Sequence, residues 1–402
     1  MSSRVFVTGI GIISAIGNDA QETLLSLKTA KSGISKPQFL TSRHSSNLAV
    51  GEVKFSDEFF KEKCGIPEQK KISRTSLLGI IAAREAVLHA GINNIKEFKT
   101  GIVSATSVGG MSAAENHFME YLDPEDTNEN LEYINTLDCS DSTECIADYL
   151  GITEFLSTIS TACSSSANSI MFGARLIRQG IVDRVIAGGT DSLSRFTING
   201  FISLKILDSN PCRPFDAARN GLNLGEGAGY LILESEKAAA GKNKLCELTG
   251  YGNSNDAYHQ TASSPEGKGA YAAMLKAIET SGISAKQIDY INAHGTGTEV
   301  NDLSEGLALK KIFGETLPPF SSTKSFTGHT LAAAGGIEAV LSVLTLQHNI
   351  IFPNLNFQTP IPELQITPVT KIITGITINN ILSNSFGFGG NTSSLIFSRT
   401  EK

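Results

Sequence analysis

Short runs of apolar and β-branched residues alternate with longer helical patterns along almost the whole chain, and this alternation restricts the fold more than any other feature. Helical patterns lie at Leu77–Ala90, Ala167–Arg178, Ala270–Ser281 and Ile337–Gln347. Such alternation predicts an α/β protein with largely parallel sheets. The predicted strands are Val5–Thr8, Gly101–Thr106, Leu156–Thr161, Arg184–Ala187, Tyr230–Leu233, Leu245–Tyr251, Tyr290–Ala293, Pro319–Ser322, Ile376–Asn379 and Ser394–Phe397.

A short internal echo predicts two similar halves. The first strand runs into Thr8-Gly9-Ile10-Gly11, and the strand that opens the second half ends in Thr249-Gly250-Tyr251-Gly252. The segment Ser235–Asn243 is small and charged, as expected of a connection. We therefore expect an N-terminal half over residues 1–240 and a C-terminal half over residues 241–402.

One segment, Glu115–Tyr149, interrupts the alternation. Its first part is acidic, and it contains Cys139 and Cys145. We interpret it as an excursion of residues 115–149 that covers the active end of the first half.

The composition excludes several classes of protein. The 402 residues are 41% hydrophobic and 18% charged with a net charge of −7, which argues against nucleic-acid binding. No uncharged apolar run reaches the length of about 18 residues that a membrane helix needs. The N-terminal segment Met1–Gly11 lacks the features of a secretory signal, so a soluble cytoplasmic protein is expected.

The cysteines form no CxxC pair and no zinc pattern, so no metal site is expected. Cys163 differs from the others because it lies in STISTACSSSAN, where a strand-like run meets a helical pattern. Backbone N–H groups and the helix dipole at such a turn should lower the thiol pKa below about 8.5, with Ser165 or Ser166 capping the helix. A buried structural cysteine is the alternative. The remaining cysteines are interpreted as buried apolar residues: Cys64, Cys139, Cys145, Cys212 and Cys246.

Two of the seven histidines follow predicted strands at corresponding ends. His294 lies in NAHGTGT and His329 in STKSFTGH, and glycines flank both. A cysteine with two imidazole N–H donors suits a reaction that forms an enolate, because both donors can stabilise charge on one thioester oxygen. The carbanion would then attack an acyl group held on the sulfur. The other histidines have no comparable setting.

Several motifs together resemble the elongating β-ketoacyl-[acyl-carrier-protein] synthases of type II systems. They are TACSS around Cys163, AHGTGT, TKSFTGH, NSFGFGGN at Asn384–Asn391, RPFD at Arg213–Asp216, and GEGAG at Gly225–Gly229. The match is collinear from Val5 to Phe397. The resemblance implies a thiolase-like fold with two related halves in a five-layered αβαβα core, and a dimer.

The resemblance also implies roles. Cys163 would accept the acyl chain, while His294 and His329 would promote decarboxylation of malonyl-carrier protein, giving 3-oxoacyl-carrier protein and CO2. Lys324 would support His294 electrostatically, helped by Glu305. The backbone N–H groups of Cys163 and Phe388 would form the oxyanion hole. No cofactor is implied, since both thioesters arrive on the phosphopantetheine arm of the carrier protein.

The resemblance also implies residues that would control access to the active-site pocket. Phe388 would gate the pocket on a glycine-flanked loop with Phe386, Gly387 and Gly389. Asp256 begins a second mobile loop near the entrance, and Val108 would set the depth of the acyl pocket across the dimer. The acidic carrier protein would dock on a basic group made of Lys70, Lys71, Arg74 and Lys205.

Some positions depart from the common pattern of this family. Glu299 stands where proline is frequent, Leu222 replaces a common phenylalanine, and the glycine loop ends in Asn391-Thr392 instead of Thr-Asn. The stretch EVNDLSEG at residues 299–306 and the altered loop resemble synthases of aryl-polyene or flexirubin-type pigment pathways, a polyketide-like class, more than those of fatty-acid elongation. The substrate and the choice between homodimer and heterodimer stay open.

Three rival functions share this fold. A thiolase needs a second catalytic cysteine late in the chain, and no cysteine follows Cys246. An initiating synthase uses a Cys-His-Asn set, whereas the second partner here is His329. A non-catalytic chain-length factor would typically have lost the cysteine; it remains the alternative, and it could also be a separate partner chain.

Overall fold

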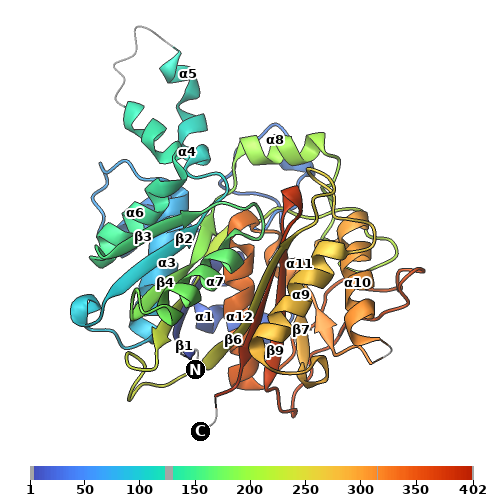
Figure 1. Cartoon of the computed structure of the whole chain (residues 1–402). Helices are drawn as coiled ribbons and strands as arrows, with labels where there is room; N and C mark the ends of the chain where they lie inside the picture. The colour runs from blue at the N-terminus through green and yellow to red at the C-terminus, as the bar shows by residue number, and fades with distance from the viewer. Residues whose placement is uncertain (1–3, 123–129, 315, 401–402) are drawn as a thin grey trace.

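The computed structural model describes residues 4–122, 130–314 and 316–400 (Figure 1). Ten strands form one continuous sheet in the order β3-β2-β4-β5-β1-β6-β10-β9-β7-β8. The first five strands in this order come from the N-terminal half and the last five from the C-terminal half. The strands are β1 (Val5–Ser14), β2 (Thr100–Ala105), β3 (Phe155–Ile159), β4 (Arg184–Asp191), β5 (Gly227–Ser235), β6 (Cys246–Asn255), β7 (Tyr290–Asn292), β8 (Phe320–Ser321), β9 (Asn380–Phe386) and β10 (Asn391–Ser398).

The sheet is mixed, so the expectation of largely parallel sheets is wrong. The central pairs β4–β5, β5–β1, β1–β6, β6–β10 and β10–β9 are antiparallel. Only the outer pairs, which β2 makes with β3 and β4 and β7 makes with β8 and β9, are parallel. The central strands are buried on both faces, and such strands form continuous apolar runs whatever their direction.

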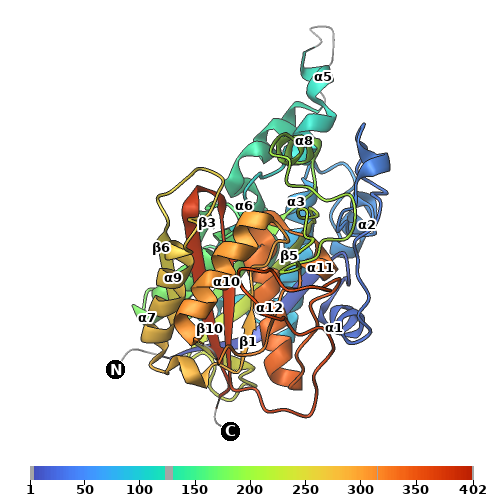
Figure 2. The ribbon, with the colours of Figure 1, turned by 90° about the vertical axis from the view of Figure 1, so that its right-hand side faces the viewer.

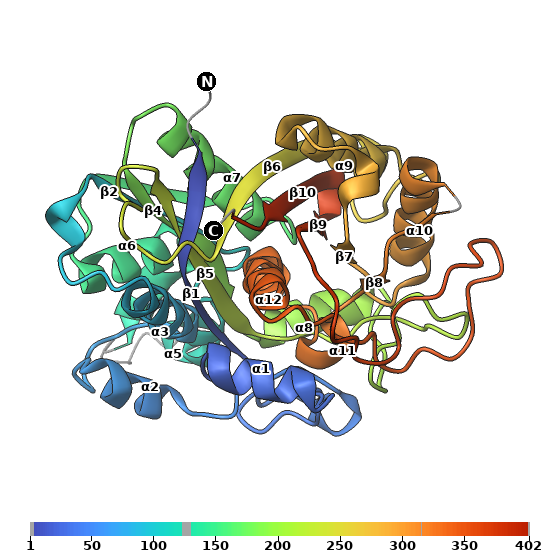
Figure 3. The same ribbon diagram turned by 90° about the horizontal axis from the view of Figure 1, so that it is seen from below.

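Helices complete a five-layered core, as the resemblance implies. Helix α7 (Ser165–Arg178) packs on β4 and β2, and α12 (Ala334–His348) packs on β5 and β9, so the curved sheet encloses both helices (Figure 3). On the outer faces, α3 (Arg74–His89) covers β1 and β5, while α9 (Lys268–Ser281) covers β6 and β10.

Close helix–strand packing explains why the same Thr-Gly-x-Gly motif occurs in both halves. A Cβ at Gly9 or Gly11 would lie 2.3 or 1.9 Å from the backbone oxygens of Ala86 and Ala82, so the α3 backbone lies directly on β1. At Gly250 and Gly252 a Cβ would lie 2.3 and 2.2 Å from the backbone oxygens of Ala277 and Ala273 on α9. In both halves the motif therefore lets the outer helix contact the strand backbone.

One predicted strand is absent from the structure, and one helix was not predicted. Ile376–Asn379 is not a strand, and the strand that follows, β9, begins at Asn380. Helix α10 (Glu299–Phe313), whose residues are buried on several sides, was not predicted. Its apolar residues are not gathered on one face, so the sequence lacks the helical periodicity that would have predicted it.

The predicted excursion divides into a core helix and a projecting arm. Helix α6 (Cys139–Leu150) packs on α3 and β3. The arm consists of α4 (Met111–Asn116), α5 (Phe118–Tyr121) and the 3-10 turn η3 (Leu131–Leu137), and it extends beyond the body in two perpendicular views (Figures 1 and 2). The acidic residues between 123 and 129 lie outside the described residues.

Among the described residues, Leu331–His348 is the one helical stretch long and apolar enough to cross a membrane. It is 89% buried inside the protein, which is typical of a core helix. It contains α12, the helix between the two halves of the sheet.

Candidate active site

Cys163 lies in the turn between β3 and α7. Ala162 has a φ of +53°, and this left-handed residue turns the chain sharply just before the thiol. Helix α7 begins at Ser165, and its cap position is Ser164. The Ser164 side chain bonds to the backbone oxygen of Thr161 (2.8 Å) and makes no cap bond to the helix. The predicted capping by Ser165 or Ser166 is therefore wrong.

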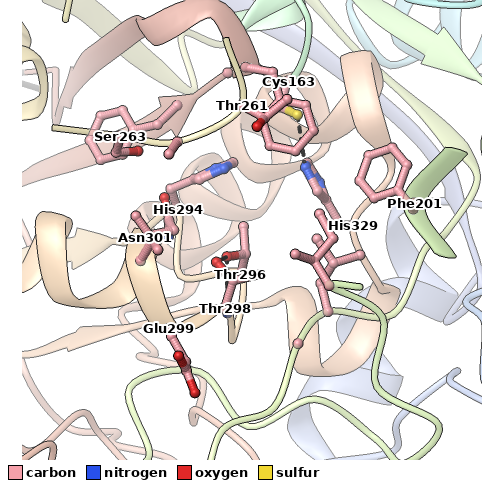
Figure 4. A pocket seen from close by; sticks show the side chains of 18 of the residues that line it. Cys163, Phe201, Thr261, Ser263, His294, Thr296, Thr298, Glu299, Asn301 and His329 are labelled. Carbon is pink, nitrogen blue, oxygen red and sulfur yellow. Dashed lines mark hydrogen bonds between the residues drawn. The ribbon is translucent and has the colours of Figure 1, made fainter. Parts of the chain in front are cut away.

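His329 contacts the thiol directly. Its Nε2 lies 3.0 Å from the Sγ of Cys163, as the dashed line in Figure 4 marks. The backbone of His329 is fixed by a bond from its N–H to the oxygen of Asn223 (2.7 Å). The 3.0 Å between Nε2 of His329 and Sγ of Cys163 allows proton transfer between the sulfur and the imidazole.

The second histidine points into the same space, and Lys324 sets its tautomer. The rings of His294 and His329 lie 5.4 Å apart at 85°. Nζ of Lys324 lies 3.2 Å from Nδ1 of His294 and donates to the backbone oxygen of His294 (2.6 Å). Because an ammonium has donors only, Nδ1 must accept, so the ring proton of His294 is on Nε2. The site thus holds a fixed N–H donor beside Cys163.

The acidic partner of Lys324 is Glu338, not Glu305. Glu338 lies on α12 and forms a buried ion pair with Nζ of Lys324. Glu305, on α10, instead accepts the backbone N–H groups of His294 (2.9 Å) and Gly295 (2.8 Å). Glu305 therefore fixes the main chain that carries His294. Glu338 was not predicted as a site residue, although a lone carboxylate in an apolar helix signals a buried partner.

Burial controls the protonation of the site. Desolvation raises the pKa of the Cys163 thiol to about 11, although Lys324 and the backbone N–H groups of Phe388 and Cys163 oppose this shift. The predicted lowering of this pKa is therefore wrong, because the thiol is only 6% exposed. Burial and then the charge of Lys324 lower the pKa values of His294 and His329 well below their usual range. At neutral pH the site holds a thiol and two neutral imidazoles.

The glycine loop closes over the thiol. Phe388 lies in the turn η6 (Phe388–Gly390) between β9 and β10, and its ring stacks on Phe201 with centroids 5.7 Å apart. A Cβ at Gly387 would lie 2.8 Å from the oxygen of Thr161. The loop backbone therefore lies directly on the nucleophile turn. Phe386 is buried, and its ring lies 5.6 Å from that of His294.

Asp256 closes the second predicted loop. Its carboxylate accepts the N–H (2.9 Å) and the hydroxyl (2.8 Å) of Ser264, and its own N–H donates to the oxygen of Gly390 (2.9 Å). The N–H of Gly389 donates to the oxygen of Gln260 (2.7 Å). The two loops are thus joined by main-chain hydrogen bonds.

A cavity of about 370 Å³ leads from the surface to Cys163 (Figure 4). Both histidines reach it, together with Lys205 and Glu299 at its outer part. Hydroxyl and amide groups give it a polar wall that sequence analysis did not identify: Thr261, Ser263, Thr296, Thr298 and Asn301. Val108 is half-buried and does not line this cavity.

Two of the predicted docking residues are exposed, and two bond to other groups of the protein. Lys205 is exposed beside the cavity, whereas Lys70 is exposed away from it. Lys71 bonds to the side-chain oxygen of Asn130 (2.7 Å). Arg74 is only 10% exposed and pairs with Glu226 (2.7 Å) as well as with an aspartate. This geometry contradicts a docking role for Arg74, whose guanidinium has a structural task.

Comparison with known proteins identifies the family. The family model described as beta-ketoacyl synthase, N-terminal domain, matches residues 2–239, and the C-terminal domain model matches residues 245–358. The chain belongs to the β-ketoacyl synthase family. It is an acyltransferase of the condensing type with a thiolase-like fold.

Relatives match over their full length. The chain is 36% identical to 3-oxoacyl-[acyl-carrier-protein] synthase 2 of Staphylococcus aureus (strain N315), covering 100% of this chain and 99% of the relative. Identity to the synthase 2 of Synechocystis sp. is 34%, covering 98% of each.

Solved structures of ketosynthases also match this chain over nearly its full length. A chain of the ishigamide ketosynthase/chain length factor matches with a TM-score of 0.92 and 29% identity, covering 100% of both chains. A chain of a ketosynthase in complex with its chain length factor from Xenorhabdus doucetiae matches with a TM-score of 0.85 and 31% identity, covering 99% of this chain and 98% of that one.

Proposed function

We propose that this synthase joins a Cys163-bound acyl group to malonyl-carrier protein and releases CO2 and 3-oxoacyl-carrier protein. The observation that carries the proposal is the contact of 3.0 Å between the Cys163 sulfur and Nε2 of His329, with the Nε2–H of His294 directed into the same cavity. Thiolases and initiating synthases use a different second partner.

In the first step the acyl group moves to sulfur. His329 accepts the thiol proton as sulfur attacks the acyl thioester, and this proton passes to the departing pantetheine sulfur. The need for this base follows from the raised pKa of the thiol. The backbone N–H groups of Cys163 and Phe388 stabilise the oxyanion that forms.

In the second step the malonyl thioester loses CO2, and the electron pair left behind forms an enolate. The Nε2–H of His294 donates to its oxygen, and His329 donates to it from Nε2 once its ring proton has moved there from Nδ1. The lowered pKa values of both histidines keep these donor rings neutral. The enolate carbon attacks the acyl carbonyl, the bond to Cys163 breaks, and the thiolate takes up one proton from solvent. These steps use protein groups alone, so no cofactor is proposed.

The alternative function, a non-catalytic chain-length factor, has less support. Such a chain has no need of a thiol in contact with a histidine, or of a lysine that fixes the tautomer of a second one. Both features are present. A chain-length factor as a separate partner remains compatible with this site.

Acyl carrier protein is the proposed macromolecular substrate. The polar wall of the cavity suits the amide-rich phosphopantetheine arm, and exposed Lys205 beside it offers a positive charge for the phosphate or for acidic helices. The six free cysteines suit a reducing cytoplasm. Val108 is proposed to line the acyl pocket of a dimer partner, because it lies away from the cavity of its own chain.

A dimer is proposed from an open edge and a nearby apolar arm. Strand β3 ends the sheet, and its Leu156 is 41% exposed. An exposed strand edge is a template for pairing with another chain. The arm exposes several large apolar side chains, an unusual concentration for a monomer: Phe118, Met119, Leu122, Leu131 and Ile134.

The test is intact-protein mass spectrometry with acyl-carrier-protein thioesters, followed by malonyl-carrier protein. We expect a mass increase on Cys163 that malonyl addition discharges, with CO2 and a 3-oxoacyl product. Preferential loading of saturated acyl groups supports fatty-acid synthesis, and loading of aryl or polyenoyl groups supports the pigment pathway. If nothing loads, alone or with a partner chain, the catalytic proposal is wrong.

A further inference from the structure

Asn391 lies at a junction of three elements beside the nucleophile. It is the first residue of β10 and directly follows the glycine loop. Its Oδ1 accepts three hydrogen bonds, from Oγ of Ser164 (2.8 Å), Nδ2 of Asn168 (2.9 Å) and Nδ2 of Asn253 (3.0 Å). Ser164 is the residue next to Cys163, Asn168 lies on α7 and Asn253 lies on β6.

The donors of this junction are themselves held in place. Oγ of Ser164 lies 2.8 Å from the oxygen of Thr161 as well as from Oδ1 of Asn391, so these two acceptors share its single proton. Oδ1 of Asn168 accepts from Asn253 (3.0 Å) and from the hydroxyl of Ser393 (2.6 Å). Asn168 and Asn253 thus bond to each other as well as to Asn391, and these linked contacts favour one position for the Asn391 side chain.

The backbone of Asn391 joins this junction to the loop that carries Phe388. Its carbonyl oxygen accepts the N–H of Gly387 (2.8 Å), which closes the loop at its base. Between these two residues, Gly389 and Gly390 have φ values of +79° and +77°. Two glycines in the left-handed region give the loop a pivot, while both of its ends are fixed at one residue.

We propose that Asn391 is a positioning residue that fastens the Phe388 loop to the residue beside the nucleophile. The network confines loop movement to residues 387–390 and returns the N–H of Phe388 to the thiol after each opening. This inference rests on the proposed gating of Cys163 by Phe388. It also gives the departure Asn391-Thr392 a physical role in this chain.

The experiment compares three variants by the reactivity of Cys163 towards a bulky aryl maleimide and towards iodoacetamide. Asn391→Ala removes the acceptor of three hydrogen bonds, so the loop should open more often and maleimide labelling should rise about tenfold, the effect of roughly one net hydrogen bond. Iodoacetamide labelling should change much less, because this reagent is small.

Asn391→Asp is the conservative variant. All three bonds use Oδ1 as an acceptor, so a carboxylate keeps them and the labelling rates should stay close to those of the unmodified protein. Thr392→Ala is the matched control, since it removes only a bond from the Thr392 hydroxyl to the oxygen of Ser254 (3.1 Å) on β6. Asn391→Ser, which is too short to reach three donors, replaces the alanine variant if that one does not fold.

A second readout is the lifetime of the acyl-enzyme formed on Cys163. We expect faster hydrolysis in Asn391→Ala than in Asn391→Asp or Thr392→Ala. Equal maleimide rates in Asn391→Ala and the unmodified protein, or equal effects of all three variants, would overturn the inference. Labelling needs no acyl substrate, so a failure of the ketosynthase proposal would appear separately as an absence of acyl loading.

Discussion

Lys324 carries a positive charge into the centre of the protein, where it serves both His294 and the fold. Its ammonium is compensated by Glu338, which burial gives a pKa of about 7 despite the opposing charge of Lys324. Removing one partner of such a pair leaves the other charge buried, whereas replacing both can leave stability unchanged. The role of Lys324 in stability can therefore be separated from its role at His294.

We predict that Lys324→Met destabilises the protein by about 3 kcal/mol, because Glu338 is left uncompensated. The double variant Lys324→Met/Glu338→Gln should recover most of this loss. Neither variant fixes the tautomer of His294, so both should condense acyl and malonyl groups about a hundredfold more slowly. Chemical denaturation and single-turnover condensation measure the two effects. Full activity in the double variant would contradict the assigned tautomer.

The protonation of Cys163 gives a second prediction. With a thiol pKa of about 11, the reactive thiolate fraction increases as pH rises and is small at neutral pH. The rate of Cys163 alkylation by iodoacetamide should therefore rise about tenfold per pH unit between about pH 7 and pH 9, without a plateau. Peptide mass spectrometry separates Cys163 from the other thiols, and Cys163→Ala is the control. A plateau near neutral pH would instead indicate a thiolate–imidazolium pair.

At the residue scale, motif spacing found the groups that meet substrate but not their support. Cys163, His294 and His329 each carry a recognisable local sequence. Glu338 and Asp191 carry no recognisable local sequence, and the groups that pair with their carboxylates are distant in the sequence. Asp191, for example, accepts from the hydroxyl of Ser107 (2.6 Å) and from the N–H of Ala332 (2.9 Å). Such contacts follow only from the tertiary fold.

At the scale of elements, close contact between strands and outer helices explains what was predicted correctly. The repeated Thr-Gly-x-Gly marked β1 and β6, since only glycine permits the contact with α3 and α9. Strand direction was predicted wrongly because burial on both faces produces the same apolar pattern in parallel and antiparallel strands. The end of the loop before β9 was wrongly predicted as a strand, because Ile376–Asn379 has a strand-like composition although it lies outside the sheet.

This packing predicts matched effects in the two halves. Gly11→Ala and Gly252→Ala should each destabilise the protein by about 3 kcal/mol, since the new methyl group overlaps a helix backbone that must move. Gly200→Ala on α8 (Arg195–Ser203) is the control, because no atom lies within 4 Å of its Cβ. It should stabilise the protein by roughly 0.5 kcal/mol. Denaturant titration measures all three, and a large difference between Gly11 and Gly252 would contradict equivalent packing.

At the scale of the whole molecule, the two ends of the sheet differ. The end at β8 is a strand of two residues. The end at β3 has five residues and packs on α6, which in turn contacts η3 of the arm. Short edge strands resist pairing, and longer apolar ones favour it. This asymmetry supports the proposed dimer through β3.

We therefore predict that Leu156→Arg weakens the proposed dimer, because an arginine at this exposed edge position of β3 would be repelled by its counterpart across a twofold axis. Sedimentation velocity should show a shift from dimer to monomer and, at protein concentrations near the dissociation constant, a loss of acyl transfer. Leu88→Arg, which changes an equally apolar side chain that is 65% exposed on α3, is the control and should leave the dimer intact. If the unmodified chain is monomeric until a chain-length-factor-like protein is added, the same substitution should abolish that heterodimer. Assembly unaffected by Leu156→Arg in both settings would place the interface away from β3.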